Sequence, residues 1–227
     1  MATSEDEKEF LGKSLINSKY VHTPDNLPLS KIYNSIIEHH RQGNYFIIFD
    51  QDSTFDIEYF TTLEAAIYAN QDINLFLPYV VHKGLIVSPG DYKIIKGKYW
   101  KQINTGRIQA RNKAAISSGM VISFRYLNTT FKGYDERLTL YGIDTYFMLQ
   151  YALSNKYFFV LDYKLKHSLS IFENEDVETV LKRFKNKKKC FAILHEKPFT
   201  KFLIVKSYIY YLSLKMAILY RDVRFLE

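Results

Sequence analysis

Apolar and polar residues follow one another in distinct blocks along the first two thirds of the chain. Ile32, Ile36 and Ile37 share one stripe of a helix that ends at the turn sequence "RQGN", and a run of apolar residues comes next. The blocks together predict helices over Leu29–His40, Leu63–Tyr68 and about Thr145–Leu153, strands over Tyr45–Phe49, Leu75–Val81, Leu85–Val87, Met120–Ser123 and Lys156–Tyr163, and a polar loop over Ser88–Gly106.

The order of these elements predicts the fold class. Helices interleaved with short apolar strands are typical of an α/β sandwich with a mostly parallel central sheet. The sequence contains neither an internal repeat nor a low-complexity linker. We therefore expect one α/β domain over residues 1–180, followed by a basic, apolar-rich helical tail over residues 181–227.

Composition narrows the class of protein further. The chain has 227 residues, 47% of them hydrophobic, which is enough to bury a large core without covalent staples. Its single cysteine, Cys190, excludes an internal disulfide and is typical of a reducing compartment. The first ten residues, "MATSEDEKEF", are acidic and polar, unlike a signal peptide. The sequence therefore favours a cytoplasmic location.

Positive charge is concentrated near the C-terminus. Between Leu181 and Glu227 the chain has 12 lysines and arginines against 3 aspartates and glutamates, a net of +9, which leaves −2 for residues 1–180 because the whole chain carries +7. Such a tail suggests contact with the inner face of an anionic membrane or with an acidic partner, and a solvated basic helix explains it equally well. Nucleic acid is a weaker alternative, because nucleic-acid readers more often carry their charge within the folded domain.

An apolar stretch from Phe202 to Tyr220 lies within this tail. Lys206 and Lys215 interrupt it, so neither part reaches the ~20 residues that cross a bilayer. The two lysines lie on opposite faces of a helix, because nine residues separate them. Packing against the domain is the interpretation that we favour slightly over a position in a membrane interface with snorkelling lysines.

Two carboxylates, Asp50 and Asp52, follow the apolar run of the predicted strand at Tyr45–Phe49. Side chains two positions apart on a strand face the same way, and hard divalent cations prefer oxygen ligands of this kind. In parallel sheets ligands bind beyond the carboxyl ends of the strands, which is where this pair lies. An Asp-x-Asp also occurs in ordinary turns, so a purely structural interpretation remains open.

One enzyme family with this pattern is the haloacid dehalogenase-like phosphatases. The segment "FIIFDQDST" resembles their strand followed by D-x-D-x-T. That resemblance implies that Asp50 is a nucleophile and Asp52 an acid/base.

A second resemblance covers more of the chain, roughly Lys19 to Ser170. The segments "DNLPLSKIYNSII", "FDQDS", "SSGMVISFRYLNTTFKGYDERLTLYGIDTYFMLQYAL" and "LKHSLS" resemble, in order and spacing, the family 2 glycosyltransferases, and among them the rhamnosyltransferase-like branch that builds bacterial surface polysaccharides. The resemblance implies a GT-A fold. It also implies an inverting, metal-dependent transfer of a rhamnose-like sugar from a nucleoside diphosphate donor to a saccharide or lipid-linked saccharide acceptor.

Residue roles follow from this second resemblance. It implies that Asp50 and Asp52 bind Mg²⁺ or Mn²⁺, that Asp144 is the catalytic base, and that His167 lies near the metal and diphosphate. Gly119 would let the backbone approach the sugar, or would simply form the turn before the next strand. The segment from Asp135 to Arg137 resembles the acceptor-side loop, and Trp100 is a candidate for stacking on a sugar ring.

The chain departs from the family at its start. Members usually begin with two strands that form one wall of the donor pocket, whereas residues 1–26 resemble the segment that comes after the second strand. We therefore expect an N-terminally truncated GT-A-like domain. A non-enzymatic remnant or interaction protein is a further alternative.

Overall fold

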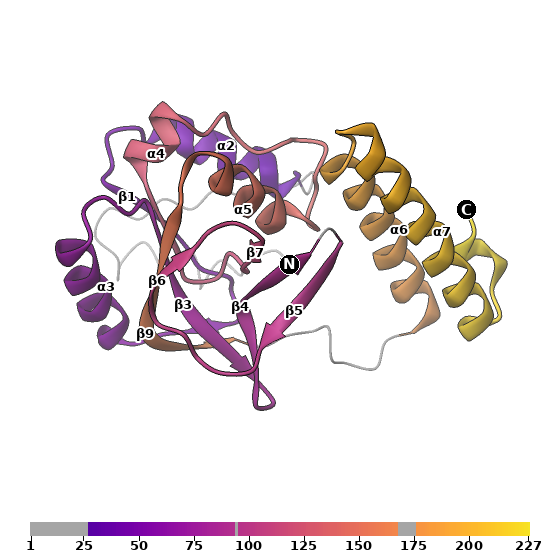
Figure 1. The fold of residues 1–227 in the computed structure, drawn as a ribbon, viewed down its shortest axis with the longest axis horizontal. Coiled ribbons are helices and arrows are strands. Elements are labelled where there is room, and N and C mark those ends of the chain that lie inside the picture. The colour runs from indigo at the N-terminus through magenta and orange to yellow at the C-terminus, as the bar shows by residue number, and fades with distance from the viewer. Residues whose placement is uncertain (1–26, 94, 168–175) are drawn as a thin grey trace, which may run out of the picture.

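The computed structural model describes residues 27–93, 95–167 and 176–227, and its elements are shown in Figure 1. The N-terminal segment in which strands are expected to be missing lies outside these residues. The helices are α2 (Leu29–His39), α3 (Ile57–Ala69), α4 (Phe124–Thr129), α5 (Ile143–Ser154), α6 (Val177–Leu194), α7 (Phe199–Tyr220) and the 3-10 helix η2 (Val223–Phe225). The strands are β1 (Tyr45–Ile48), β2 (Ser53–Thr54), β3 (Leu75–His82), β4 (Leu85–Lys93), β5 (Lys96–Trp100), β6 (Gly106–Gln109), β7 (Lys113–Ala114), β8 (Met120–Ser123) and β9 (Tyr157–His167).

The chain is a mixed α/β protein whose nine described strands form one large sheet. Its central path runs in the order β1-β8-β3-β4-β5, and β9 lies against β3. Of the eight pairings between described strands, only that of β3 with β9 is parallel. The prediction of a mostly parallel sheet is therefore wrong. Among the described strands, β8 is the one partner of β1, so β1 is an edge of this sheet.

Short connections explain the antiparallel pairing of β3 with β4 and of β4 with β5. β3 and β4 are joined by Lys83 and Gly84, both with positive φ, and such a two-residue turn returns the chain beside the strand that it has just left. The next strand, β5, pairs with β4 although its residues are mostly exposed. The predicted polar loop over residues 88–106 is therefore wrong: residues 88–93 continue β4 and are mostly buried, and β5 shows no apolar run because it has no buried face.

Side chains of the sheet alternate between two apolar clusters, one on each face. On β3, Leu75 and Leu77 belong to the first cluster, whereas Phe76 and Val80 belong to the second. The first cluster is covered by residues of α2, α4 and α5, and the second by residues of α3. Figure 1 shows the same separation, with α2, α4 and α5 together at the top of the view and α3 at the left. The predicted α/β sandwich is confirmed at this level.

The C-terminal region forms a helical hairpin that has a small core of its own. Leu181 and Phe184 of α6 and Phe225 of η2 are buried together, and partly buried residues of α7 pack against them. Asp176 caps α6 by accepting a hydrogen bond from the Thr179 N–H at 2.9 Å. The predicted boundary between residues 180 and 181 falls at the end of the first turn of α6.

The hairpin contacts the α/β body through the C-terminal half of α6, where Cys190 is buried in the first apolar cluster, and through the residues just after this helix. His195 and the Tyr92 hydroxyl share a hydrogen bond of 3.1 Å, and Glu196 pairs with Arg137 at 3.0 Å. Figure 1 shows the hairpin beside the body, at the right of the view. The expected packing of the apolar C-terminal stretch against the α/β domain is not found among the described residues: α7 packs on α6 and η2, and it is α6 and the segment after it that contact the body.

Candidate functional site

The Asp-x-Asp segment lies in a tight turn that stacked aromatic rings close. Phe49 before the turn and Phe55 after it have ring centroids 4.1 Å apart, and the Ser53 N–H donates to the Asp50 carbonyl at 3.0 Å. Asp50 is half-buried and Asp52 is exposed. The predicted strand before the pair is confirmed as β1, but the backbone turns immediately after it.

This turn lies beside the end of β9. Ser53 is opposite His167 in the antiparallel pair of β2 and β9, and Thr54 is opposite Lys166. The backbone of His167 is therefore close to the turn that carries Asp52, as a shared site requires. The side chain of His167 lies outside the described part of the structure.

Gly119 has a packing role. Its φ is +73°, its N–H donates to the Ile48 carbonyl at 2.7 Å, and a Cβ placed on it would lie 2.6 Å from the Pro78 ring. The Tyr59 hydroxyl donates to its carbonyl at 3.0 Å. This geometry supports the turn interpretation, because the glycine lets the segment before β8 pass close to the end of β1. An approach of this backbone to a sugar stays a prediction.

Asp144 occupies the first turn of α5. The helix begins after Gly142, whose φ of +81° is in the left-handed region, and any Cβ there would collide with the Cys190 sulfur of α6. A carboxylate in a first turn is stabilised by the partial positive charge of the helix N-terminus. The position of the predicted base therefore depends on a glycine that lets α5 begin directly against α6.

The surroundings of Asp144 raise the pKa of its carboxyl group to about 6. Burial is the largest cause, the negative charge of Asp50 adds to it, and hydrogen bonds with Ser117 oppose it. The structure therefore brings together two residues that the sequence placed in different roles, Asp50 beside the metal and Asp144 beside the acceptor. A carboxyl group with this pKa is ionised at neutral pH and is still a stronger base than an ordinary aspartate.

Sequence reasoning missed two residues at this point, Tyr33 and Ser117. Tyr33 of α2 is buried, and its pKa is raised by burial and by the negative charges of Asp144 and Asp50, while a hydrogen bond with Ser117 lowers it. Tyr134 lies beside Tyr33 and its pKa is also raised, by burial and by the charge of Asp144. Tyr33 lies three and four positions before Ile36 and Ile37, on the apolar stripe of the predicted helix, and this position is the signal that the sequence offers.

Hydrogen bonds dock α2 onto the loop that leads to α5. The Ser30 hydroxyl donates to the Leu138 carbonyl at 2.5 Å, and the Asn34 side chain and the Tyr134 backbone exchange two hydrogen bonds of 2.7 and 3.0 Å. The serine is fully buried. These contacts hold α2, and with it Tyr33, against the segment that leads to α5.

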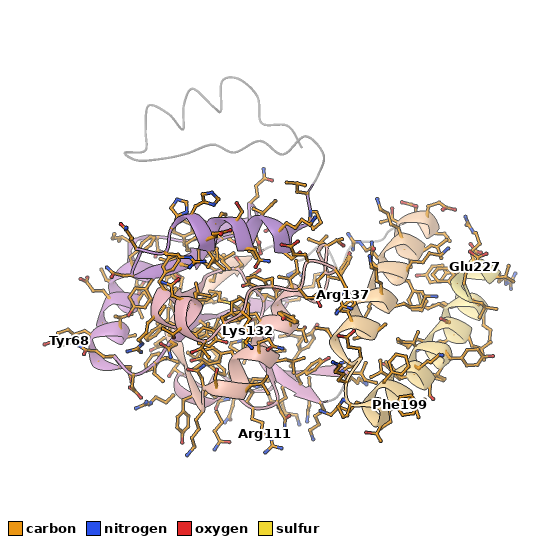
Figure 2. The ribbon with its side chains drawn as sticks, turned by 90° about the horizontal axis from the view of Figure 1, so that it is seen from above. Tyr68, Arg111, Lys132, Arg137, Phe199 and Glu227 are labelled. Carbon is orange, nitrogen blue, oxygen red and sulfur yellow. The ribbon has the colours of Figure 1, made fainter. Side chains whose placement is uncertain are left out.

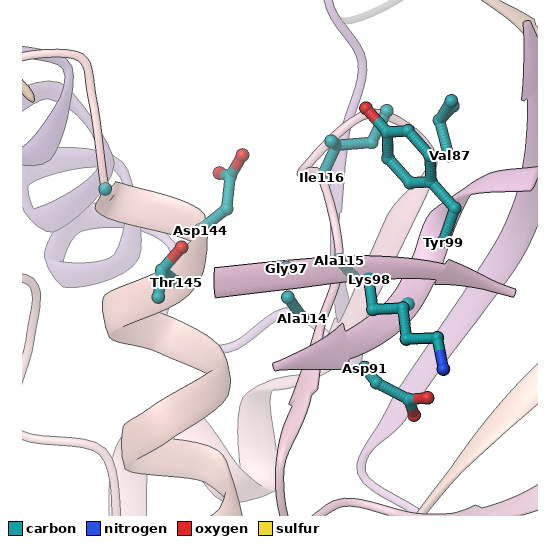
Figure 3. A pocket seen from close by; sticks show the side chains of 12 residues that line it. Val87, Asp91, Gly97, Lys98, Tyr99, Ala114, Ala115, Ile116, Asp144 and Thr145 are labelled. Atoms are coloured by element: carbon teal, nitrogen blue, oxygen red, sulfur yellow. The ribbon is translucent and has the colours of Figure 1, made fainter. Parts of the chain in front are cut away.

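A cavity of about 210 Å³ opens beside Asp144. Asp144 and Thr145 line it from α5, and Lys98, Tyr99 and Asp91 line it from β4 and β5, as Figure 3 shows. Tyr99 is about half exposed. The wall opposite α5 therefore offers the aromatic ring of Tyr99, and much of the remaining lining is glycine and alanine, which leaves room for a saccharide.

The other residues that the resemblance singled out have structural partners. Arg137 pairs with Asp135 at 2.6 Å and with Glu196 at 3.0 Å, so the predicted acceptor-side loop is tied to the segment between α6 and α7. The Trp100 indole N–H donates to Asp91 at 3.3 Å, and the ring packs against the first apolar cluster. Stacking of Trp100 on a sugar stays a prediction.

The described side chains that could ligate a metal ion are few, as is usual where the ion binds together with substrate phosphates. Among the side chains described, no three of the types His, Cys, Asp and Glu converge as a metal site. Mg²⁺, however, is usually held by one or two protein carboxylates together with substrate phosphates. Binding of such a metal by Asp50 and Asp52, with His167 as a third ligand, stays a prediction.

Five predicted site residues are thus located in the fold. Asp50 and Asp52 lie on the turn after β1, and Gly119 directly precedes β8, beside the end of β1. Asp144 is in the first turn of α5, and the backbone of His167 ends β9. Comparison with protein-family models and with curated proteins finds no match for the chain.

Proposed function

We propose that the chain is an inverting, metal-dependent glycosyltransferase domain with a GT-A-like fold, which moves a rhamnose-like sugar from a nucleoside diphosphate to a saccharide acceptor. The proposal rests mainly on the surroundings of Asp144. Its carboxyl group is half-buried at a helix N-terminus, has a pKa of about 6, and lines a cavity that a sugar ring could enter. A general base works best when its pKa lies near the working pH.

Asp144 takes the proton from the acceptor hydroxyl in this reaction. The freed oxygen forms a bond to the anomeric carbon, and the bond from that carbon to the diphosphate oxygen breaks with its electron pair leaving on the diphosphate. Attack from the face opposite the leaving group inverts the anomeric centre. Ser117 holds the Asp144 carboxylate through hydrogen bonds, and Tyr33 in turn holds Ser117.

Asp50 and Asp52 act at the donor end. A divalent cation bound there would stabilise the negative charge of the leaving diphosphate as a Lewis acid. The stacking of Phe49 on Phe55 keeps the two carboxylates on one turn, and the pairing of Ser53 with His167 keeps that turn at the end of β9. The acceptor would lie across the cavity that Asp144 and Tyr99 line.

Calorimetric titration with the diphosphates of uridine, thymidine and guanosine, each with and without Mn²⁺, tests the donor end. We expect metal-dependent binding of one of them, weakened more than about tenfold by Asp52→Ala, because a metal ligand is lost. Asp162→Asn is the matched control, since Asp162 is an exposed carboxylate on β9. Unchanged binding by Asp52→Ala would show that the metal site is misassigned.

Two results would contradict the proposal as a whole. If a folded sample binds none of the three diphosphates, the chain is better explained as a non-enzymatic remnant. If the chain hydrolyses a generic phosphomonoester and Asp50→Asn abolishes that turnover, the phosphatase interpretation of "FIIFDQDST" is the correct one.

A further inference from the structure

The apolar character of α7 does not match the way in which the helix is packed. Apolar residues occur all round its circumference, and a helix of that kind is normally buried in a core or in a membrane. Of its 22 residues, however, only Val205 and Ser213 are buried. By length and composition α7 could even cross a membrane. Most of its apolar surface is therefore left exposed by the described residues.

Two lysines divide α7 into a packed half and an open half. Lys206 and Lys215 lie 180° apart around the axis, because nine residues at about 100° each separate them. One half between them carries Leu212 and Met216, which pack on the core formed with α6 and η2, and also the buried Val205. Leu219, near the Lys215 edge of this half, is 64% exposed. The other half, which we call the open face, carries the exposed residues Phe199, Leu203, Ile204, Tyr210, Tyr211, Leu214 and Ile218.

The open face resembles a surface that lies in a membrane interface. Tyr210 is 71% exposed and Ile218 is 70% exposed, so the rings and the aliphatic chains both point outward. Tyrosine combines an apolar ring with a polar tip and is enriched where a bilayer meets water. Lysines at the two edges can lay their aliphatic stems along such a surface and keep their charge in the headgroup layer.

Charge also identifies the partner. α7 contains three lysines and no acidic residue, and residues 181–227 carry a net charge of +9. Each basic residue near an anionic bilayer adds to the attraction, whereas a neutral protein surface would gain nothing from them. The apolar face and the basic charge therefore complement an anionic lipid surface.

A spanning orientation conflicts with the packing of the hairpin. α6 lies against α7 and carries five lysines between Lys182 and Lys189. If α7 crossed the bilayer, these charges would enter the hydrocarbon or the hairpin would have to open, and both are unfavourable. Figure 2 shows the hairpin at one end of the molecule, with Phe199 and Glu227 on it and Tyr68 at the opposite end. A position flat on the surface of a bilayer avoids both costs.

We propose that α7 lies in the plane of an anionic membrane surface, with its open face in the headgroup region and Lys206 and Lys215 along its two edges. This inference rests on the hairpin alone and does not depend on the proposed glycosyltransferase activity.

Flotation of the full chain with lipid vesicles tests the inference. The vesicles contain either phosphatidylcholine alone or equal parts of phosphatidylcholine and phosphatidylglycerol. The chain should float with the anionic vesicles and much less with the neutral ones, and high salt should release it. Lys206→Gln combined with Lys215→Gln should weaken binding about 25-fold, at about fivefold for each lysine. Leu214→Glu combined with Ile218→Glu should abolish it, because two charges enter the apolar face.

The matched control is Tyr68→Glu combined with Leu153→Glu, which adds the same charges at exposed apolar residues of the body. It should bind like the unchanged chain. If vesicle binding is lost equally in this control and in the variant with Leu214→Glu and Ile218→Glu, the inference is overturned, because net charge alone would then explain binding. Failure of the chain to float with anionic vesicles would also overturn it. A third outcome would assign the open face to a second copy of the chain. In that case the chain does not float, light scattering shows a dimer, and Leu214→Glu combined with Ile218→Glu dissociates it.

Discussion

Asp144 and Asp52 lie at the two ends of the candidate site, and the fold surrounds their carboxylates differently. Asp144 is half-buried on α5 and is held by hydrogen bonds with Ser117, so its position and its pKa are fixed by the folded chain. Asp52 is exposed on a turn after β1. With the roles proposed above, the base is organised before substrate arrives, whereas the donor end is completed by what binds there.

The difference in burial between Asp144 and Asp52 also predicts which of the two lowers the free energy of unfolding. A buried carboxylate with a raised pKa destabilises the native state once it is ionised, while an exposed one is nearly neutral in this respect. Active sites commonly retain such unfavourable groups because the chemistry needs them. Substitution of Asp144 should therefore lower activity and raise stability, whereas substitution of Asp52 should weaken donor binding and leave stability almost unchanged.

Asp144→Asn should have the largest effect. Loss of a general base lowers the rate of transfer about 10²- to 10⁴-fold, while binding of the nucleoside diphosphate is retained. The measurement is sugar transfer to an acceptor under saturating donor, with calorimetry on the same sample. Full transfer activity in Asp144→Asn would show that the base is misassigned.

The same variant should be more stable than the unchanged chain at neutral pH. The pKa of Asp144 is raised from its ordinary value near 4 to about 6, so its contribution to stability is present below pH 4 and is lost as the pH rises past 6. An asparagine side chain has no charge to bury, and we expect a gain of about 1–2 kcal/mol at pH 8, after allowance for partial exposure, and almost none at pH 4. Thermal unfolding at both pH values measures it. Asp52→Ala is the control and should change stability little at either pH.

Gly142→Ala tests how firmly the base is positioned. A left-handed backbone with a Cβ costs about 1–2 kcal/mol, and the collision with the Cys190 sulfur adds to this. We expect a loss of about 2–4 kcal/mol in unfolding free energy and a lower rate of transfer, because α5 must shift. Denaturant unfolding measures the first effect.

Cys190→Ala separates the two causes of that loss. It removes the sulfur that the new Cβ would meet, so Gly142→Ala should cost less in this background, with the backbone penalty remaining. An equal cost in both backgrounds would mean that contact with α6 does not position α5.

Sequence reasoning located both ends of the site but not the contact between them. β1 and α5 have clear apolar patterns, so the strand before Asp50 and a helix beginning near Asp144 could be predicted from neighbours in the chain, whereas the turn that carries Asp50 and Asp52 could not. The meeting of Asp144 with Tyr33 and Ser117 depends on how α2 docks, which no local pattern records. Burial of the carboxylate, and hence its pKa, could not be predicted for the same reason.

The direction of the sheet could not be predicted for a different reason. Helices alternate with strands in the first half of the chain, which favours parallel pairing, but the Lys83–Gly84 turn and the polar strand β5 reverse it. On α7, the sequence alone presents the two lysines as a break in an apolar stretch. With one half packed on α6, they become the edges of its open face.

Asp50→Asn should have the smallest effect of these substitutions. It gives the sharpest test of how the surroundings of Asp144 differ from those of Asp52. The negative charge of Asp50 helps to raise the pKa of Asp144, so its removal should lower that pKa from about 6 toward the ordinary value, and burial should keep part of the shift. Titration of the Asp144 carboxyl carbon by NMR, without metal or nucleotide, measures the change directly. Asp52→Asn is the matched control, because it removes the same charge two residues away on the exposed side of the turn. The opposite result would be a larger change in the pKa of Asp144 from Asp52→Asn than from Asp50→Asn. Asp52 would then be the carboxylate that faces Asp144, and Asp50 would be the outer group at the donor end.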